Sequence, residues 1–171
     1  MYLYLLILRI LHIVCGVFWA GTAMFLAFYV FPAVINAGPD GPKIMQGIMS
    51  TRNMPVVMTF ISLITVVTGI LLMWNLSAGF TADWFTSKYG VALATGGITA
   101  TIAFIQAWFI NKPGAARMQT IGQAVAKRGG APTSEEQSEL GKLRSRIFLS
   151  TQWIAAWVII SVVSMGGARY I

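Results

Sequence analysis

The sequence has few charged residues, and none of its acidic residues falls inside a long apolar stretch. Only 10% of the 171 residues are charged, whereas the charged fraction of ordinary soluble domains is about 25%. The acids all lie between the apolar runs: Asp40, Asp83, Glu135, Glu136 and Glu139. A relay of buried carboxylates, the usual device of proton-driven pumps, is therefore not expected.

Cysteine and histidine each occur once, as Cys15 and His12. A single cysteine excludes an intramolecular disulfide, a CxxCH heme-attachment motif and a zinc site built on paired cysteines. A single histidine excludes bis-histidine ligation of a heme within one chain. No catalytic triad can be assembled without a second histidine or an acid in the apolar segments. Because no glycine-rich phosphate loop occurs either, hydrolases and ATPases are not expected.

Long apolar runs dominate what is present. Hydrophobic residues make up 57% of the chain, and four runs have the length of about 20 residues that a membrane-spanning helix needs: residues 2–35, 54–78, 90–111 and 147–168. The first run is too long for a signal-peptide core, so we expect it to be retained. The sequence predicts an all-α integral membrane four-helix bundle, with residues 1–171 as one transmembrane domain.

The net charge of +7 is concentrated in two of the segments that join the runs. Cations near the other ends are limited to Lys88 and Arg169, whereas the first and third connecting loops carry nine: Lys43, Arg52, Lys112, Arg117, Lys127, Arg128, Lys142, Arg144 and Arg146. Membrane topology explains this bias without any nucleic-acid partner. By the positive-inside rule, we expect a multi-pass protein of a bacterial-type inner membrane, with loops one and three cytoplasmic and both termini outside.

The third loop has its own helical pattern. Apolar residues continue at helical spacing past Pro113 until Gly129, Gly130 and Pro132 break the pattern. Thr133 and Glu136 have the spacing of a capping box, which predicts the start of a new helix. We therefore expect a cytoplasmic helical hairpin between the third and fourth spans.

In the first loop, a short amphipathic piece around Ile44 to Met49 is expected to lie along the inner interface, after a bend near Pro32.

The first run contains the best candidate for a functional site. At helical spacing, Arg9, His12, Gly16 and Trp19 fall on one stripe, which we expect to face the bundle because ionisable groups are costly in a membrane. A neutral imidazole is a good ligand for heme iron or copper. Gly16 would leave room for a flat macrocycle, Trp19 would shape the pocket, and Arg9 would pair with a propionate. This pattern predicts a heme b site with His12 as the metal ligand.

The same residues fit a purely structural interpretation. His12 would then donate a hydrogen bond to a neighbouring helix, and Arg9 would reach the lipid headgroups. The chain would in that case be a non-catalytic membrane subunit or an assembly factor of a larger complex. Gln106, a long amide in the middle of the third run, needs a polar partner under either interpretation.

A third interpretation is copper handling. Met45 and Met49, and Met54 and Met58, are two pairs at four-residue spacing, and thioethers suit Cu(I). Together with His12 they would form a copper path. Methionine is also a common apolar filler, which explains the same spacing without any metal.

The first run also carries a motif, LHxxxGxxWxGxxxF, which is formed by Leu11, His12, Gly16, Trp19, Gly21 and Phe25 and is followed by Pro32. It resembles the first helix of small four-helix bacterial membrane proteins related to the copper resistance protein D family and to the HemJ-type protoporphyrinogen oxidases. The resemblance implies that His12 matches the helix-one histidine thought to ligate heme in the oxidase branch, and a metal-handling histidine in the copper branch. The chain departs from these patterns in having no second histidine, and the functional lysine of the oxidase branch has no counterpart within the apolar runs.

The expected function is redox chemistry or electron transfer at a membrane-embedded heme b or a related redox centre, with copper as the alternative metal. The lipid bilayer is one expected partner, and a second copy of the chain or a larger membrane complex is another. The residues leave open whether the chain is an enzyme, what its substrate or electron donor is and which group supplies a second axial ligand.

Overall fold

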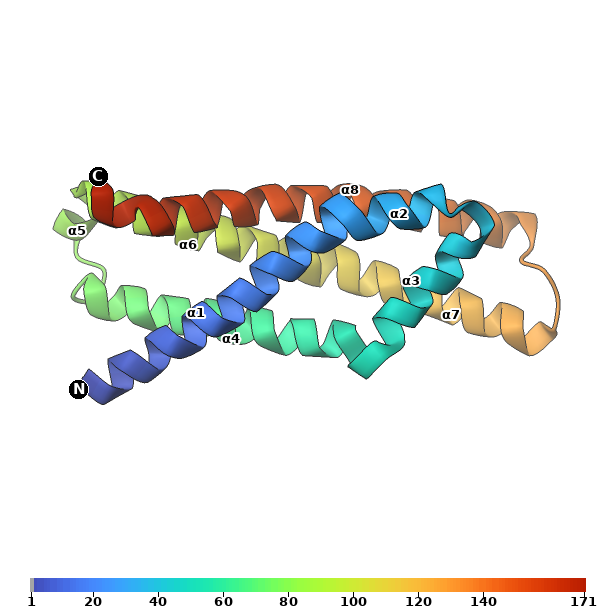
Figure 1. The fold of residues 1–171 in the computed structure, drawn as a ribbon, viewed down its shortest axis with the longest axis horizontal. Coiled ribbons are helices and arrows are strands. Elements are labelled where there is room, and N and C mark those ends of the chain that lie inside the picture. The colour runs from blue at the N-terminus through green and yellow to red at the C-terminus, as the bar shows by residue number, and fades with distance from the viewer. Residues whose placement is uncertain (1) are drawn as a thin grey trace.

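The computed structural model describes residues 2–171, and this part of the chain is helical with no strand. Four long helical stretches are long and apolar enough to cross a membrane: Tyr2–Asn36, Gly38–Leu76, Lys88–Arg128 and Ser134–Tyr170. The all-helical fold and the four apolar helices expected from the sequence are therefore present. Both termini lie at the same end of the bundle (Figure 1).

The first stretch consists of α1 (Tyr2–Phe25), a π-helical turn (Leu26–Val30) and α2 (Phe31–Asn36). A 3₁₀ turn (Gly38–Asp40) leads into α3 (Gly41–Ser50), which runs obliquely back to α4 (Met54–Leu76) (Figure 1). A 3₁₀ turn (Thr51–Asn53) joins α3 to α4, and both Arg52 and Asn53 in it have left-handed backbone angles. Two consecutive non-glycine residues in this region make a sharp corner between the two helices.

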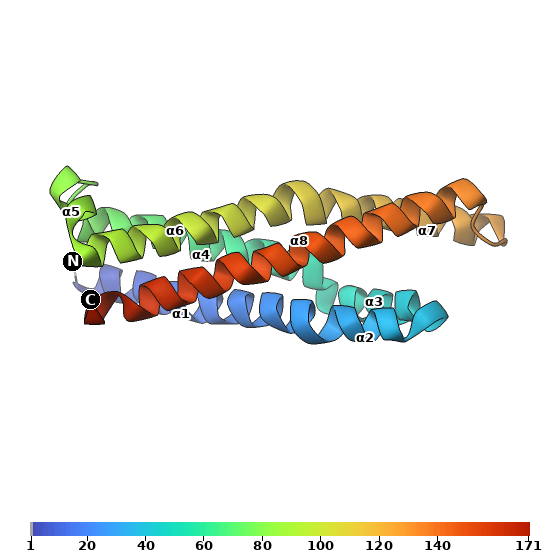
Figure 2. The same ribbon diagram turned by 90° about the horizontal axis from the view of Figure 1, so that it is seen from above.

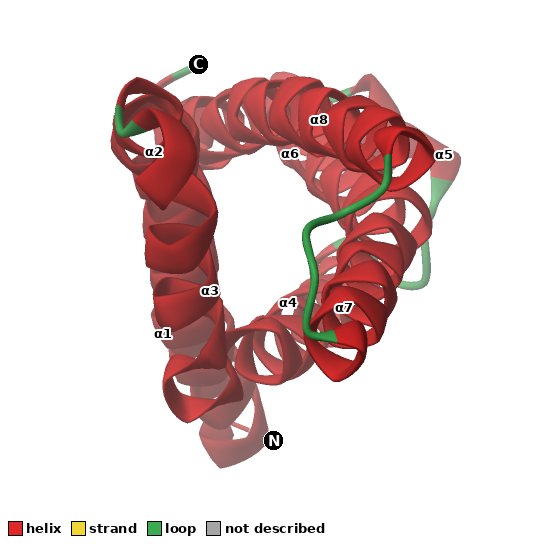
Figure 3. Cartoon of the chain, turned by 90° about the vertical axis from the view of Figure 1, so that its right-hand side faces the viewer, coloured by secondary structure: helices red, strands yellow, loops and turns green. Residues whose placement is uncertain are grey.

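At the other end, α5 (Ala82–Thr86) connects α4 to α6 (Lys88–Gln106). A second π-helical turn (Ala107–Asn111) joins α6 to α7 (Lys112–Arg128). The last helix, α8 (Ser134–Gly167), runs the length of the molecule and ends in a 3₁₀ turn (Ala168–Tyr170) (Figure 2). Seen end-on, α1 to α3 form one side of the molecule and α6 to α8 stand across from them (Figure 3).

Each π-helical turn ends two residues before a proline, Pro32 in one case and Pro113 in the other. A proline inside a helix lacks an N–H group and clashes with the carbonyl four residues earlier. A π-helical turn widens the backbone at that point, so the helical path continues through the proline. The helical path therefore continues past both prolines. For Pro113, this agrees with the helical pattern of the sequence beyond it.

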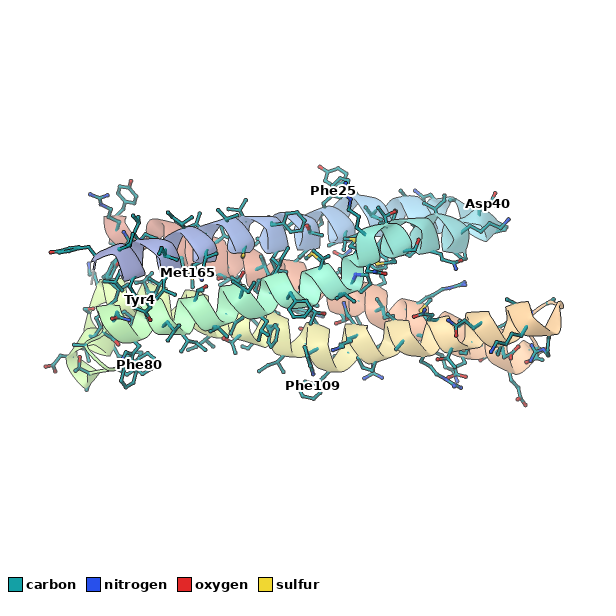
Figure 4. All side chains as sticks on the ribbon, turned by 90° about the horizontal axis from the view of Figure 1, so that it is seen from below. Tyr4, Phe25, Asp40, Phe80, Phe109 and Met165 are labelled. Atoms are coloured by element: carbon teal, nitrogen blue, oxygen red, sulfur yellow. The ribbon has the colours of Figure 1, made fainter. Side chains whose placement is uncertain are left out.

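The helices pack mainly as two pairs, α1 with α4 and α6 with α8. Where α1 meets the second pair, a small core forms around Trp19, together with Ala20, Ala23, Ala103, Ile154 and Val158. Small residues let membrane helices approach closely, and Ala103 and Ala27 are fully buried. Large side chains such as Phe25 and Phe109 point outward from the bundle (Figure 4), as expected for a surface that contacts lipid.

The α7–α8 connection has the capping box that the sequence predicted. The Thr133 hydroxyl accepts a hydrogen bond from the Glu136 N–H, and the Glu136 carboxylate accepts one from the Thr133 N–H. The same carboxylate forms a bidentate pair with Arg128, at 2.7 and 3.1 Å. A second bidentate pair joins Arg117 of α7 to Glu139 of α8.

These contacts make the α7–α8 tip sensitive to acid. The hydrogen bonds from Arg128 and from the Thr133 backbone lower the pKa of Glu136 to about 2. Because the folded-state pKa lies below the ordinary value of about 4.3, the stabilisation is complete above that value and is lost as the pH falls toward 2. We expect spin labels placed at Gln123 and Gln137 to separate over this pH range. Glu136→Gln should weaken the pH dependence, leaving only the part from Glu139, whose pKa its hydrogen bonds to Arg117 also lower, and Glu135→Gln should keep it in full. Identical titrations of all three proteins would contradict the assignment.

Candidate functional site

His12 belongs to α1, and its imidazole lies against α4, in the part of the bundle nearer to the termini. Its Nδ1 atom lies 2.9 Å from the Thr65 carbonyl oxygen and 3.3 Å from the Thr68 Oγ1. Since a carbonyl oxygen can only accept, the short contact requires the proton to be on Nδ1, and His12 donates to Thr65. This hydrogen bond fixes both the tautomer and the orientation of the ring.

Gly69 makes the close approach of the imidazole possible. A Cβ atom built on Gly69 would stand 2.8 Å from the His12 Cε1 and 3.3 Å from Nδ1. Carbon atoms essentially never approach so closely in proteins, so a side chain at position 69 would displace the ring. The α4 backbone therefore presents three features to His12: an acceptor at Thr65, a hydroxyl at Thr68 and an open surface at Gly69.

The second ring nitrogen, Nε2, makes no hydrogen bond with residues 2–171. It is also not sealed inside the protein, because Asn111 Oδ1 is the one buried side-chain N or O atom without a partner in that part of the chain. With the proton on Nδ1, Nε2 carries the lone pair. His12 thus presents a ring nitrogen that is not fully enclosed and whose lone pair is free to bind a metal ion.

The other residues of the predicted stripe have different surroundings. Arg9 is exposed, three residues from His12, and forms no salt bridge within the described chain. Gly16 faces α4, where a Cβ would stand 3.5 Å from the Thr65 Cγ2. Trp19 is buried in a core to which α4, α6 and α8 all contribute. The structure therefore brings His12 and Gly16 to α4 alone and places Trp19 where α6 and α8 join α4.

These surroundings test whether a planar cofactor fits. The donor set suits it, because one imidazole nitrogen is fixed by a carbonyl and the other is accessible. The space between α1 and α4 is already filled by Thr65 next to Gly16. A group bound to Nε2 would therefore have to lie at the outer edge of the α1–α4 pair.

Gly69→Ala is expected to disturb this site directly. The new methyl group would push the imidazole away from Thr65 and lower the free energy of unfolding by about 1 kcal/mol. Gly166→Ala is the matched control, because a Cβ there meets nothing within 4 Å. Unfolding in mixed detergent micelles measures both variants. Equal stability of the two proteins would show that the ring does not rest on Gly69.

A second polar group of residues joins α8 to its neighbours, and the sequence analysis identified only one member of it, Gln106 of α6. Gln106, which was expected to need a partner, donates to the Ser150 carbonyl and hydroxyl oxygens, both at 3.1 Å. Asn111 donates to Thr151 Oγ1 at 3.0 Å, and Gln152 donates to the Ala27 carbonyl at 2.7 Å. Three consecutive α8 residues thus contact the two π-helical regions. Gln152 contacts the first turn, Thr151 contacts the second, and Ser150 contacts Gln106, the residue just before the second turn. The amide at position 152, inside the fourth apolar run, was the available sequence signal.

The methionines proposed for copper are divided between two places. Met58 packs against the core around Trp19, whereas Met54 lines a groove beside α1. Within residues 2–171 no group of three or more histidine, cysteine, aspartate or glutamate side chains is placed to hold a metal ion. A copper site in this part of the chain would therefore need thioether ligands.

No known protein-family model, curated protein or solved structure matches this chain.

Proposed function

We propose that this chain is a membrane protein that uses His12 to bind heme b or a related redox centre, for redox chemistry or electron transfer. The observation that carries the proposal is the state of the imidazole. Its Nδ1 donates a hydrogen bond to Thr65, and its Nε2 has no partner and keeps a lone pair that can bind a metal ion. Iron-bound histidines in proteins are commonly held in this way. When bound, such a group supplies reversible one-electron chemistry.

The residues of this chain would hold and orient the group. His12 Nε2 provides the metal ligand, and the Thr65 carbonyl raises its basicity through the Nδ1 hydrogen bond. Arg9, exposed one turn away, provides a positive charge for a carboxylate of the group. Gly69 lets α1 and α4 approach closely enough to fix the imidazole, and Gly16 faces Thr65 on the same side of α1.

The distribution of cations along the bundle supports a particular orientation of the chain in the membrane. The end of the bundle that carries α3, α7 and the start of α8 holds most of the cations, whereas both termini lie at the opposite end (Figure 1). We propose that the cationic end is cytoplasmic and that the α7–α8 hairpin projects into the cytoplasm. Cysteine labelling of intact cells at Lys127→Cys and Tyr170→Cys tests this orientation. Labelling of position 127 by an impermeant reagent from outside would contradict it.

An absorption spectrum tests the cofactor. Protein purified from heme-supplied cells should show a Soret band that shifts on reduction with dithionite. Heme should be present in a fixed ratio to protein after size-exclusion chromatography. A colourless preparation that also fails to bind added hemin would contradict the proposal.

A structural role is the second candidate, and the two α4 contacts of His12 favour it. The hydrogen bonds to Thr65 and Thr68 attach α1 to α4 without any cofactor. The chain would then serve as a non-catalytic subunit or an assembly factor in a larger membrane complex. A colourless protein that co-purifies with a defined membrane partner would support this role over the first.

A further inference from the structure

A groove opens between the last turns of α1 and the corner where α3 meets α4. Its volume is about 410 Å³, and it is lined mainly by apolar groups of Phe25, Leu26, Ile48 and Met54. Gly21 also lines the groove, and a Cβ there would meet nothing within 4 Å. The lining residues of the groove include neither His12 nor any of the polar residues that join α8 to its neighbours.

One polar side chain lines this apolar groove without a hydrogen-bonding partner. The other threonines within helices satisfy their hydroxyl groups by donating to a carbonyl of the preceding turn, as Thr65 and Thr68 do. Thr22 makes no such bond and no other hydrogen bond within residues 2–171, although it lies inside α1. Its hydroxyl is not sealed off either. Since an unpaired hydroxyl in an apolar environment is costly, Thr22 is available to donate to a group that enters the groove.

A cation lies in the turn next to the groove's lining residue Met54. Arg52 occupies the short turn between Ile48 and Met54, is exposed, and forms no salt bridge with residues 2–171. Lys43, on the same helical hairpin, is already paired with Asp40. The groove therefore has an apolar lining with one hydroxyl group, and an exposed guanidinium group that forms no salt bridge lies two residues from its lining residue Met54.

We infer that this groove binds an anionic phospholipid. An acyl chain lies along Phe25 and Leu26, an ester carbonyl oxygen accepts a hydrogen bond from Thr22, and the phosphate group pairs with Arg52. Guanidinium groups bind phosphate in a bidentate manner, which favours an anionic lipid over an uncharged one. The inference does not depend on His12 or on any cofactor.

Two variants separate the parts of this site. Gly21→Leu fills the groove and should be tolerated by the fold, because the added atoms enter open space. Arg52→Gln removes the charge at the corner. Matched controls are Gly166→Leu, which places the same side chain at another glycine with open surroundings, and Lys127→Gln, which removes one exposed cation from α7.

The test uses the full chain in vesicles that contain spin-labelled phosphatidylglycerol or spin-labelled phosphatidylcholine. Selectivity is the relative association constant of the two labelled lipids, obtained from their motionally restricted fractions. We expect phosphatidylglycerol to be favoured over phosphatidylcholine by at least about threefold, and Arg52→Gln to lose most of this selectivity. Gly21→Leu should reduce the restricted fraction of both lipids, and both controls should behave as wild type. Equal selectivity in Arg52→Gln and wild type, or an unchanged restricted fraction in Gly21→Leu, would overturn the inference.

Mass spectrometry of the purified protein identifies what occupies the groove. Co-purified anionic phospholipid that is lost in Gly21→Leu supports the inference. Recovery of a quinone or another uncharged isoprenoid in its place would overturn it.

Discussion

Replacing His12 by asparagine is expected to abolish heme binding while leaving the stability of the protein nearly unchanged. The asparagine Nδ2 occupies nearly the position of the imidazole Nδ1, so it can still donate to the Thr65 carbonyl. It offers no nitrogen lone pair in place of Nε2. Loss of a group that only orients a metal ligand lowers metal affinity by about 10- to 100-fold, so loss of the ligand itself should exceed this range.

His12→Ala provides the comparison. Alanine removes both the ligand and the hydrogen bond to Thr65, so it should lose heme as asparagine does and also lower the free energy of unfolding by about 1 kcal/mol. Hemin titration followed at the Soret band measures the first effect, and unfolding in mixed micelles measures the second. If asparagine and alanine reduce stability equally while the wild type binds no heme, His12 has only a structural role.

Gln152→Leu is expected to separate α8 from the first helical stretch. Gln152 donates to the Ala27 carbonyl at 2.7 Å, and Ala27 is fully buried within the π-helical turn. Leucine has a similar volume but cannot donate, so this carbonyl loses its α8 partner in a dry environment. A buried group that loses its partner costs about 1–3 kcal/mol, which is larger than the expected effect of Gly69→Ala.

The control for Gln152→Leu is Gln123→Leu on the exposed surface of α7, where the glutamine makes no hydrogen bond among those of the described chain. Unfolding of both variants in mixed micelles gives the difference directly. A Gln152→Leu protein as stable as Gln123→Leu would mean that the bond to Ala27 does not hold the two halves of the bundle together.

Composition and spacing were sufficient to predict the helical architecture. A long apolar run without acids has few alternatives to a spanning helix, and Gly129, Gly130 and Pro132 end α7 because their backbone preferences oppose helix continuation. The capping box at Thr133 and Glu136 is equally local, since its two hydrogen bonds join residues three apart. Such features depend on neighbouring residues and can be derived from the sequence alone.

The site was only partly predictable because it depends on which helices become neighbours. Helical spacing placed His12 and Gly16 on one stripe, but it did not show that α4 would present Thr65 and Gly69 to that stripe. Trp19 lies on the same stripe by spacing, yet α6 and α8 as well as α4 contribute to the core around it, because α1 crosses α4 and then approaches the second helix pair. The groove at Thr22 joins residues more than 25 positions apart and has no local pattern.

The tautomer of His12 tests the central claim most directly, because the proposed ligand atom exists only if the proton is on Nδ1. His12 is the only histidine in the sequence, so ¹⁵N-histidine labelling gives signals from this ring alone. Solid-state NMR of the labelled protein in lipid bilayers should show a protonated Nδ1 and an unprotonated Nε2, with the Nε2 signal changing when hemin is added. A protonated Nε2, or an Nε2 signal that hemin leaves unaltered, would contradict the assignment of His12 as the ligand.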